Sequence, residues 1–308
     1  MDATRRLAAR GCGGLNRAMD LPHPAFTLTR PRRHSAPVVF SSAHSGRDYP
    51  PAFVASARLD AMRLRRSEDA FVDLLYASAP RLGAPLLAAN FPRAFCDANR
   101  EPWELDPGMF EDALPDWVNV DSPRVAAGLG TIAKLVGSGE NIYGGRLHFA
   151  EAEARVRDCW QPFHAALAEL LETTRLHFGA VLLVDCHSMP GNALPARAPA
   201  DFVLGDAYGT ACTPAFTALA EQTLRGMGYR VRRNEPYAGG FITRHYGRPR
   251  QDIHALQIEI NRALYMDEAA IAQGPRFDAV ADDLARLVAV LTEAASGIML
   301  PGLAEAAE

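Results

Sequence analysis

The stretch VLLVDCHSMPG, Val181–Gly191, begins with four branched apolar residues and ends in polar ones. A continuous apolar run of this kind is typical of a strand buried on both faces, and such strands occur mainly in α/β sheets that are covered by helices. The carboxyl end of the strand then opens into the crevice where these sheets bind ligands. His187 is therefore either a functional side chain at the sheet edge or a histidine that only caps the strand.

A second stretch, Val38–Gly46 (VVFSSAHSG), repeats the pattern of an apolar strand that ends on histidine and serine. Because the carboxyl ends of parallel strands meet at one edge of a sheet, we expect His44 and His187 to lie close together. Neutral imidazoles are common zinc ligands, and catalytic zinc takes three protein ligands and leaves one position for water. The two histidines therefore predict a metal site that needs a third ligand.

The composition excludes several classes of protein. The chain has 308 residues, of which 48% are hydrophobic and 22% charged, as in an ordinary soluble globular protein. The formal net charge of -4 gives no basic bias toward nucleic acid, and no apolar run approaches the roughly 20 residues that cross a membrane. The five cysteines are scattered without a CxxC pair, which favours a reducing compartment. We expect a cytoplasmic protein whose partner is a small molecule.

The chain alternates between strand and helix patterns, which predicts a largely parallel sheet with helices on both faces. We expect one domain over residues 34–308, preceded by a disordered or loosely packed extension over residues 1–33 in which Met19 is an alternative start. The long stretch rich in Pro, Gly and Asp up to about residue 130 is predicted to be a functional loop. Besides the opening strand, the expected strands are 37–43, 85–89, 229–233 and 255–260, and the expected helices begin at 67 and span 151–177, 214–227 and 277–295.

The third metal ligand is expected among the acidic residues that follow His44. Glu68 and Asp69 lie just after Ser67, which is a good N-cap for the predicted helix. Acidic residues in a first turn also stabilise a helix by about 0.3–1 kcal/mol without any other role. The pattern alone leaves both interpretations open.

The strand over residues 255–260 carries a row of polar side chains. Period-2 alternation places Gln257 and Glu259 on one face and apolar residues on the other. On an inner strand this polar face would line a cavity, whereas on an edge strand it would only be solvated. In a cavity beside a metal, Glu259 would be a candidate general base.

Two clusters of arginines complete the candidate residues. Arg93, Asn99 and Arg100 follow the predicted strand 85–89, and a guanidinium group is suited to a carboxylate or a developing oxyanion. Arg244 and His245 lie on a loop after two glycines. Arg244 is a candidate for binding an acidic substrate, and His245 is either a proton donor or an ordinary loop histidine.

Taken together, five motifs in one order resemble the N-formylglutamate amidohydrolase (N-formylglutamate deformylase) family. Each motif alone is weak, but the series is specific and covers most of the chain. The resemblance implies an α/β/α sandwich with a mixed, largely parallel sheet, similar to the zinc carboxypeptidases. The motifs are SSAHSG (41–46), RAFCDANR (93–100), DCHSMP (185–190), GGFITRHYG (239–247) and LQIEINRALYM (256–266).

The resemblance also implies roles for the candidate residues. Zinc, with cobalt or manganese as alternatives, would be bound by His44, His187 and an acid. Carboxypeptidases place that acid three residues after the first histidine, where this chain has Arg47, so the resemblance favours Asp69, with Glu68 as the alternative. The implied general base is Glu259, Arg93 would polarise the scissile carbonyl, and the groups for substrate carboxylates are Asn99, Arg100, Arg244 and His245.

The implied reaction is hydrolysis of N-formyl-L-glutamate to formate and L-glutamate in histidine breakdown. Hydrolysis of another small N-acyl amino acid or peptide-like amide is the alternative within the enzymes. A catalytically inactive amino-acid-binding module on the same fold is the alternative outside them.

Overall fold

The protein is described by a computed structural model over residues 23–195, 197 and 199–299. Most of the extension predicted for residues 1–33, including Met19, lies outside these residues. Within its described part, β1 (Phe26–Thr29) pairs with β3 (Leu86–Ala89), so residues 26–29 belong to the domain. The predicted boundary at residue 33 is therefore too late in the chain. Within the described part of the chain, no helix combines the length and the hydropathy that a membrane span requires.

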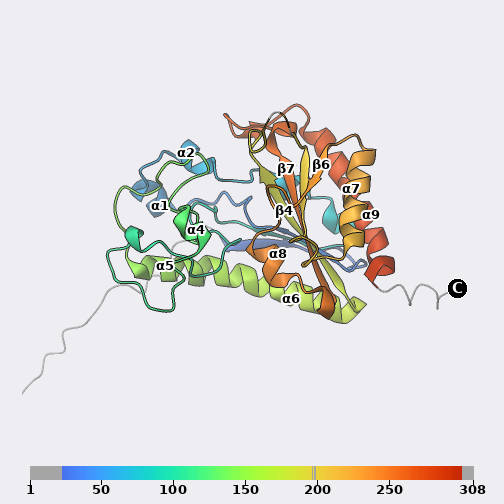
Figure 1. The fold of residues 1–308 in the computed structure, drawn as a ribbon, viewed down its shortest axis with the longest axis horizontal. Helices are drawn as coiled ribbons and strands as arrows, with labels where there is room; N and C mark the ends of the chain where they lie inside the picture. Colours follow the sequence, from blue (N-terminus) through green and yellow to red (C-terminus); the bar gives the residue numbers. More distant parts are fainter. Residues whose placement is uncertain (1–22, 196, 198, 300–308) are drawn as a thin grey trace, which may run out of the picture.

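A seven-stranded sheet in the order β1-β3-β2-β4-β7-β5-β6 forms the centre of the molecule (Figure 1). The four strands β3, β2, β4 and β7 run parallel, whereas β1 and β5 run antiparallel to their inner neighbours and β6 is parallel to β5. The predicted mixed, largely parallel sheet is therefore confirmed. The remaining bounds are β2 Val38–Ser42, β4 Val181–Met189, β5 Phe202–Gly205, β6 Val231–Arg233 and β7 Ile253–Asn261.

The opening stretch forms β4, a strand at the middle of this sheet. All nine residues of β4 are buried, as the continuous apolar run predicted. Gly179, with φ +87°, ends the preceding helix in the left-handed region that favours glycine, so the chain turns directly into β4. β4 lies between β2 and β7, which brings the ends of the two histidine-bearing stretches to the same edge.

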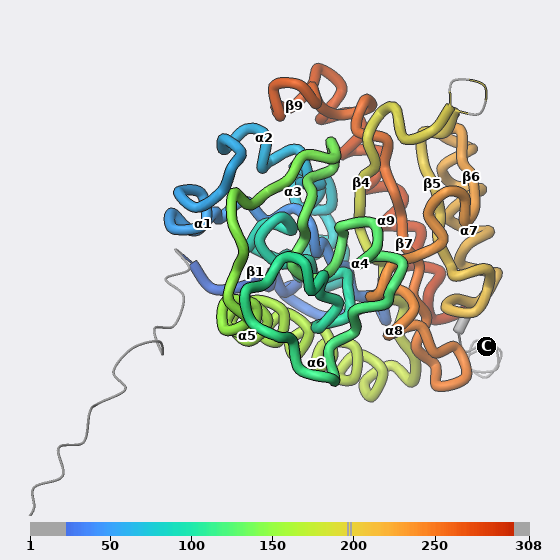
Figure 2. Tube along the Cα trace, turned by 60° about the vertical axis from the view of Figure 1, so that its left-hand side comes forward, coloured from blue at the N-terminus to red at the C-terminus, as the bar shows by residue number. Residues whose placement is uncertain are grey.

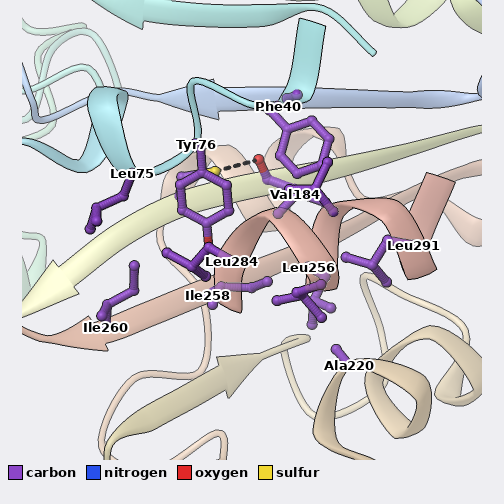
Figure 3. Close-up of a cluster of buried hydrophobic side chains, with 14 of the residues drawn as sticks. Phe40, Leu75, Tyr76, Val184, Ala220, Leu256, Ile258, Ile260, Leu284 and Leu291 are labelled. Atoms are coloured by element: carbon purple, nitrogen blue, oxygen red, sulfur yellow. Dashed lines mark hydrogen bonds between the residues drawn. The ribbon is translucent and has the colours of Figure 1, made fainter. Parts of the chain in front are cut away.

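Helices cover both faces of the sheet, as the predicted three-layer sandwich requires (Figure 1). Helices α3, α7 (Pro214–Gly226) and α9 (Phe277–Met299) pack on one face, over the core shown in Figure 3. In that core, side chains such as Val184 and Leu256 are completely buried, and each large apolar side chain contributes about 1.5–3 kcal/mol. Helices α6 (Gln161–Phe178) and α8 (Phe241–Tyr246) contribute to a second core on the other face.

The helix predicted from Ser67 is wrong over most of its length. Residues 67–71 form turns, and Phe71 has φ +66°, a left-handed conformation that a helix does not contain. A short α3 (Val72–Leu75) and a 3₁₀ helix, η1 (Ala79–Leu82), replace it. The hydroxyl of Ser67 accepts the N–H of Gly137 instead of capping a helix, so contacts with distant segments override the local helical pattern here.

Two further differences concern elements that local patterns do not reveal. β5 lies where no strand was expected, because its four residues are too few to show a period. The helix predicted over residues 151–177 is divided into α5 (Phe149–Arg155), a π-helical turn η3 (Val156–Trp160) and α6. Pro162 lies in the first turn of α6, where proline is tolerated, so the interruption comes before it.

The long segment between β3 and α5 packs beside the sheet as a tube that is green in Figure 2. It has its own small apolar core, which includes Leu105 and Phe110. The smaller elements of the chain are α1 Pro51–Ser56, α2 Ala61–Arg65, η2 Pro107–Met109, α4 Pro123–Ala126, η4 Pro249–Gln251, η5 Arg262–Leu264, β8 Met266–Asp267 and β9 Ala272–Gln273.

Candidate active site

Two histidines and an aspartate meet at the carboxyl edge of the sheet. His44 follows β2 and His187 lies in β4, and their ring centroids are 4.7 Å apart. Asp69 Oδ2 lies 2.9 Å from His187 Nδ1 and 3.4 Å from His44 Nδ1. All three side chains are buried, and one ligand atom from each lies within 4.8 Å of the others. The geometry thus brings together the three residues that the sequence predicted as metal ligands.

The donor atoms of this group fit a divalent metal ion. His44 Nδ1 is buried without a hydrogen-bond partner among the described residues, so this nitrogen is available to a ligand. The Nε2 atoms of both histidines face carboxylates, His44 at 2.7 Å from Asp97 Oδ1 and His187 at 3.0 Å from Asp185 Oδ1. Carboxylates behind the imidazoles favour the tautomer with the proton on Nε2, in which both Nδ1 atoms can bind a metal ion. Two imidazole nitrogens and one carboxylate form a ligand set that catalytic zinc uses.

The groups around Asp69 keep its carboxylate ionised. Burial alone would raise the pKa of Asp69, but the neighbouring imidazoles of His187 and His44 and the charge of Arg262 hold that pKa well below its usual value. Arg262 Nη2 donates to Asp69 Oδ1 at 2.8 Å, and Arg262 Nε donates to Ser188 Oγ at 3.2 Å. Arg262 therefore orients the carboxylate that lies between the two histidines.

Glu259 lies beside the same group. It pairs in register with His187 across β4 and β7, and β7 is an inner strand, so the solvated-edge interpretation of its polar row is excluded. Its carboxylate accepts a hydrogen bond from Gln257 Nε2 at 2.9 Å. Burial, with a contribution from the charge of Asp69, outweighs the nearby cations and raises the pKa of Glu259 to about 7. A carboxyl group with this pKa can both accept and donate a proton near neutrality.

A cavity of about 760 Å³ connects these groups. Its wall contains His44, Asp69 and His187, together with Glu259 and most of the predicted substrate residues. His245 is the exception, because it lines only a smaller side cavity of about 280 Å³ and stacks on Phe241 at 4.8 Å. The predicted residues in the wall of the main cavity are His44, Asp69, Arg93, Asn99, Arg100, His187, Arg244 and Glu259.

The predicted cluster over residues 93–100 is held by Asp97. Arg93 Nη2 donates to Asp97 Oδ2 at 2.9 Å. Burial tends to raise the pKa of Asp97, but His44, Arg100 and Arg93 lower it well below its usual value. Arg100 donates from Nε to the Leu129 carbonyl and from Nη1 to the Asn99 carbonyl, both at 2.7 Å. Asp97 thus connects the arginine cluster to a candidate metal ligand.

Asn99 has protein partners at both amide atoms. Its Oδ1 accepts the N–H of Ile242 at the start of α8, at 2.8 Å, and its Nδ2 lies 3.1 Å from His187 Nε2. A Cβ at Gly240 would lie 2.2 Å from Asn99 Nδ2, so this close approach requires glycine. The predicted role of Asn99 in substrate binding stays a prediction.

An aromatic cluster behind the cavity supports the same loop. The π-helical turn places Trp160 and His164 in a stack with a centroid distance of 3.8 Å. Trp160 Nε1 donates to the Arg100 carbonyl at 3.0 Å, and His164 Nε2 lies 2.8 Å from the Ala98 carbonyl. His164 Nδ1 lies 2.9 Å from the hydroxyl of Tyr246, at the end of α8. His164 therefore joins the 97–100 loop to the helix that carries Arg244.

Comparison with known proteins identifies the family. A family model described as N-formylglutamate amidohydrolase matches residues 36–266. The chain belongs to this family. It is 32% identical over 253 residues to the N-formylglutamate deformylase of Pseudomonas aeruginosa, covering 78% of this chain and 85% of that one. The N-formylglutamate deformylase of Pseudomonas putida is 31% identical over 242 residues, covering 75% and 82%.

A solved structure supports the same assignment. The crystal structure of N-formylglutamate amidohydrolase from Ralstonia eutropha superposes with a TM-score of 0.84 and 39% identity, covering 88% of this chain and 98% of the other. These findings confirm the family resemblance of the motifs, the fold class and the prediction of a hydrolase that acts on amides.

Several residues of this N-formylglutamate amidohydrolase family member escaped sequence reasoning. Asp185 and Arg262 belong to quoted motifs, but only the fold shows that Asp185 contacts His187 Nε2 within β4 and that Arg262 donates to Asp69, 193 residues earlier in the chain. Gln257 was assigned only to the polar face of its strand, although it contacts Glu259 and accepts the N–H of Gly240. Arg124, which lines both cavities, comes from a loop that has no readable pattern.

Proposed function

We propose that the protein is a zinc-dependent deformylase that hydrolyses N-formyl-L-glutamate to formate and L-glutamate. The observation that carries this proposal is the placement of a His-Asp-His group and the buried carboxyl group of Glu259 in one arginine-lined cavity. The relatives from Pseudomonas aeruginosa and Pseudomonas putida are both named N-formylglutamate deformylase. We further propose that the reaction takes place in the cytoplasm, as a step of histidine breakdown.

His44, Asp69 and His187 would hold the metal, with cobalt or manganese as alternatives to zinc. When bound, a divalent ion supplies a Lewis acid that makes water more acidic and polarises a carbonyl group. Asp97 and Asp185 would keep the imidazoles oriented through their Nε2 atoms. This arrangement gives the site an electrophilic centre beside Glu259.

Glu259 takes a proton from the water that attacks the formyl carbon. It then donates a proton to the amine nitrogen as the carbon–nitrogen bond breaks, which releases formate and the free amine of glutamate. Arg93, held by Asp97, donates to the oxygen that becomes negative on the formyl carbon. Arg100, Arg244 and Asn99 bind the substrate carboxylates, and His245 lies farther out on the side cavity.

The alternative within the enzymes is hydrolysis of another small N-acyl amino acid, and the alternative outside them is a binding module without activity. A single assay separates these functions. Metal-loaded protein is incubated with N-formyl-L-glutamate and, in parallel, with N-acetyl-L-glutamate, and formate, acetate and glutamate are measured. The proposal predicts equimolar formate and glutamate from the formyl substrate. Acetate as the faster product would favour the first alternative, and tight binding of either compound without any product would favour the second.

A further inference from the structure

The arginines of the main cavity divide into two groups by their partners. Five of them lie 2.8–3.8 Å from a carboxylate oxygen of the protein. Arg124 and Arg244 have no carboxylate partner among the residues that the structure describes. The five paired arginines are Arg65 with Glu68, Arg66 with Glu140, Arg93 and Arg100 with Asp97, and Arg262 with Asp69.

The two unpaired arginines lie at one place in the cavity wall. Arg124 belongs to α4 and Arg244 to α8, and both line the main cavity and the side cavity. Figure 2 shows α4 and α8 near one another in front of the sheet. Arg100 also lines both cavities, but two of its nitrogens already donate to backbone carbonyls. The unpaired positive charge is therefore concentrated at the junction of the two cavities.

The acidic residues of the side cavity have hydrogen-bond partners other than Arg124 and Arg244. Glu104 Oε2 accepts the N–H of Glu101, and Glu101 Oε2 accepts a hydrogen bond from Asn119. Burial lowers the pKa of Arg100, and the charges of Arg93 and Arg124 add to that decrease, whereas those of Asp97 and Glu104 oppose it. An anionic ligand group would complete the site.

We propose that Arg124 and Arg244 form a subsite for the side-chain carboxylate of the substrate, so that the enzyme selects N-formyl amino acids with an acidic side chain. This inference rests on the proposed function and deepens it. A guanidinium group binds a planar carboxylate through two parallel hydrogen bonds, a contact that a neutral amide of the same shape cannot reproduce. Selectivity for glutamate over glutamine therefore depends on these two side chains.

The test measures binding without turnover. Glu259→Gln, which removes the proposed base, is loaded with zinc and titrated calorimetrically with N-formyl-L-glutamate and with N-formyl-L-glutamine, which has nearly the same shape but lacks the charge. We expect the glutamate compound to bind at least about 30-fold more tightly. Adding Arg124→Gln or Arg244→Gln should reduce this ratio at least about tenfold by weakening only the glutamate compound.

Arg250→Gln is the matched control in the same background. Arg250 is exposed, has no carboxylate partner among the described residues and lines neither cavity, so its substitution should leave the ratio unchanged. Equal weakening of both compounds by Arg124→Gln would indicate a structural role and overturn the inference, as would a ratio near one before substitution.

Formate release by the otherwise unmodified enzyme separates this inference from the proposed function. Release from N-formyl-L-glutamate together with an unchanged binding ratio in the Arg124 and Arg244 variants would refute the subsite alone. Failure of both formate release and binding would refute the proposed function, and the subsite with it.

Discussion

Substitution of Asp97 by asparagine tests the link between the arginine cluster and the candidate metal ligand. Asp97 Oδ1 lies 2.7 Å from His44 Nε2 and accepts the N–H of Asn99 at 2.8 Å, while Oδ2 accepts from Arg93. Asparagine keeps one oxygen and the shape, but it removes the negative charge behind His44 and presents an NH₂ group to Arg93. Loss of such a partner lowers metal affinity about 10–100-fold, equivalent to about 1.4–2.8 kcal/mol.

The assay is competition for zinc with a chromophoric chelator at neutral pH, combined with thermal unfolding to show that the variant is folded. Asp112→Asn is the matched control, because Asp112 also faces a histidine, His148 Nδ1 at 3.3 Å, but at an exposed position. The control should bind zinc as the unmodified protein does. A folded Asp97→Asn protein whose zinc affinity stays within about twofold of the control would refute the role assigned to Asp97.

Three further predictions concern Glu259 and His164. Because the base works deprotonated and burial raises the pKa of Glu259 to about 7, kcat/KM should rise with pH through about 7. Glu259→Gln should remove this rise and lower kcat about 10²–10⁴-fold while zinc is retained. A rise in kcat/KM that persists in the variant would place the base elsewhere. In the metal-free protein, folding raises the pKa of Glu259 from 4.5 to about 7, so this carboxyl group loses its proton at a lower pH in the unfolded state than in the folded state. The stability of the fold therefore falls as pH rises between these values. Glu259→Gln should therefore be more stable than the unmodified protein at pH 8 by about 3 kcal/mol and equal to it near pH 4, which urea unfolding at the two pH values measures. His164→Leu should raise KM about tenfold, with kcat and zinc content little changed. His164→Gln should restore most of the substrate affinity, because its amide can donate to the Ala98 carbonyl. An equal loss of kcat in steady-state assays would argue against a positioning role.

The parts of the structure that local patterns predicted are those in which one chain segment decides its own conformation. The continuous apolar run predicted β4 as an inner strand. The two strand-end histidines were predicted to lie close together because parallel strands share a carboxyl edge, and they do. The alternation in β7 placed Glu259 on a polar face before any contact was known. These inferences need only the period of the sequence and the geometry of a sheet.

The parts that sequence reasoning missed depend on contacts between distant segments. The pattern of residues 67–71 predicted a helix start, but the contacts of Ser67 with Gly137 and of Asp69 with Arg262 accompany turns in this stretch instead. Nothing in the local pattern could reveal that the candidate ligand Asp69 would be oriented by an arginine far along the chain. Arg124 was missed for the same reason, because its place in the cavity is set by the fold of a long irregular loop.

The most direct test of the account is a joint measurement of metal content and formate release on the same preparations. Unmodified protein and Asp69→Ala are purified, exposed to zinc, separated from free ion and assayed with N-formyl-L-glutamate. The account predicts one equivalent of zinc and equimolar formate and glutamate for the unmodified protein, with both lost in a folded variant. Full formate release from protein that holds no metal, or full zinc binding by the variant, would contradict it.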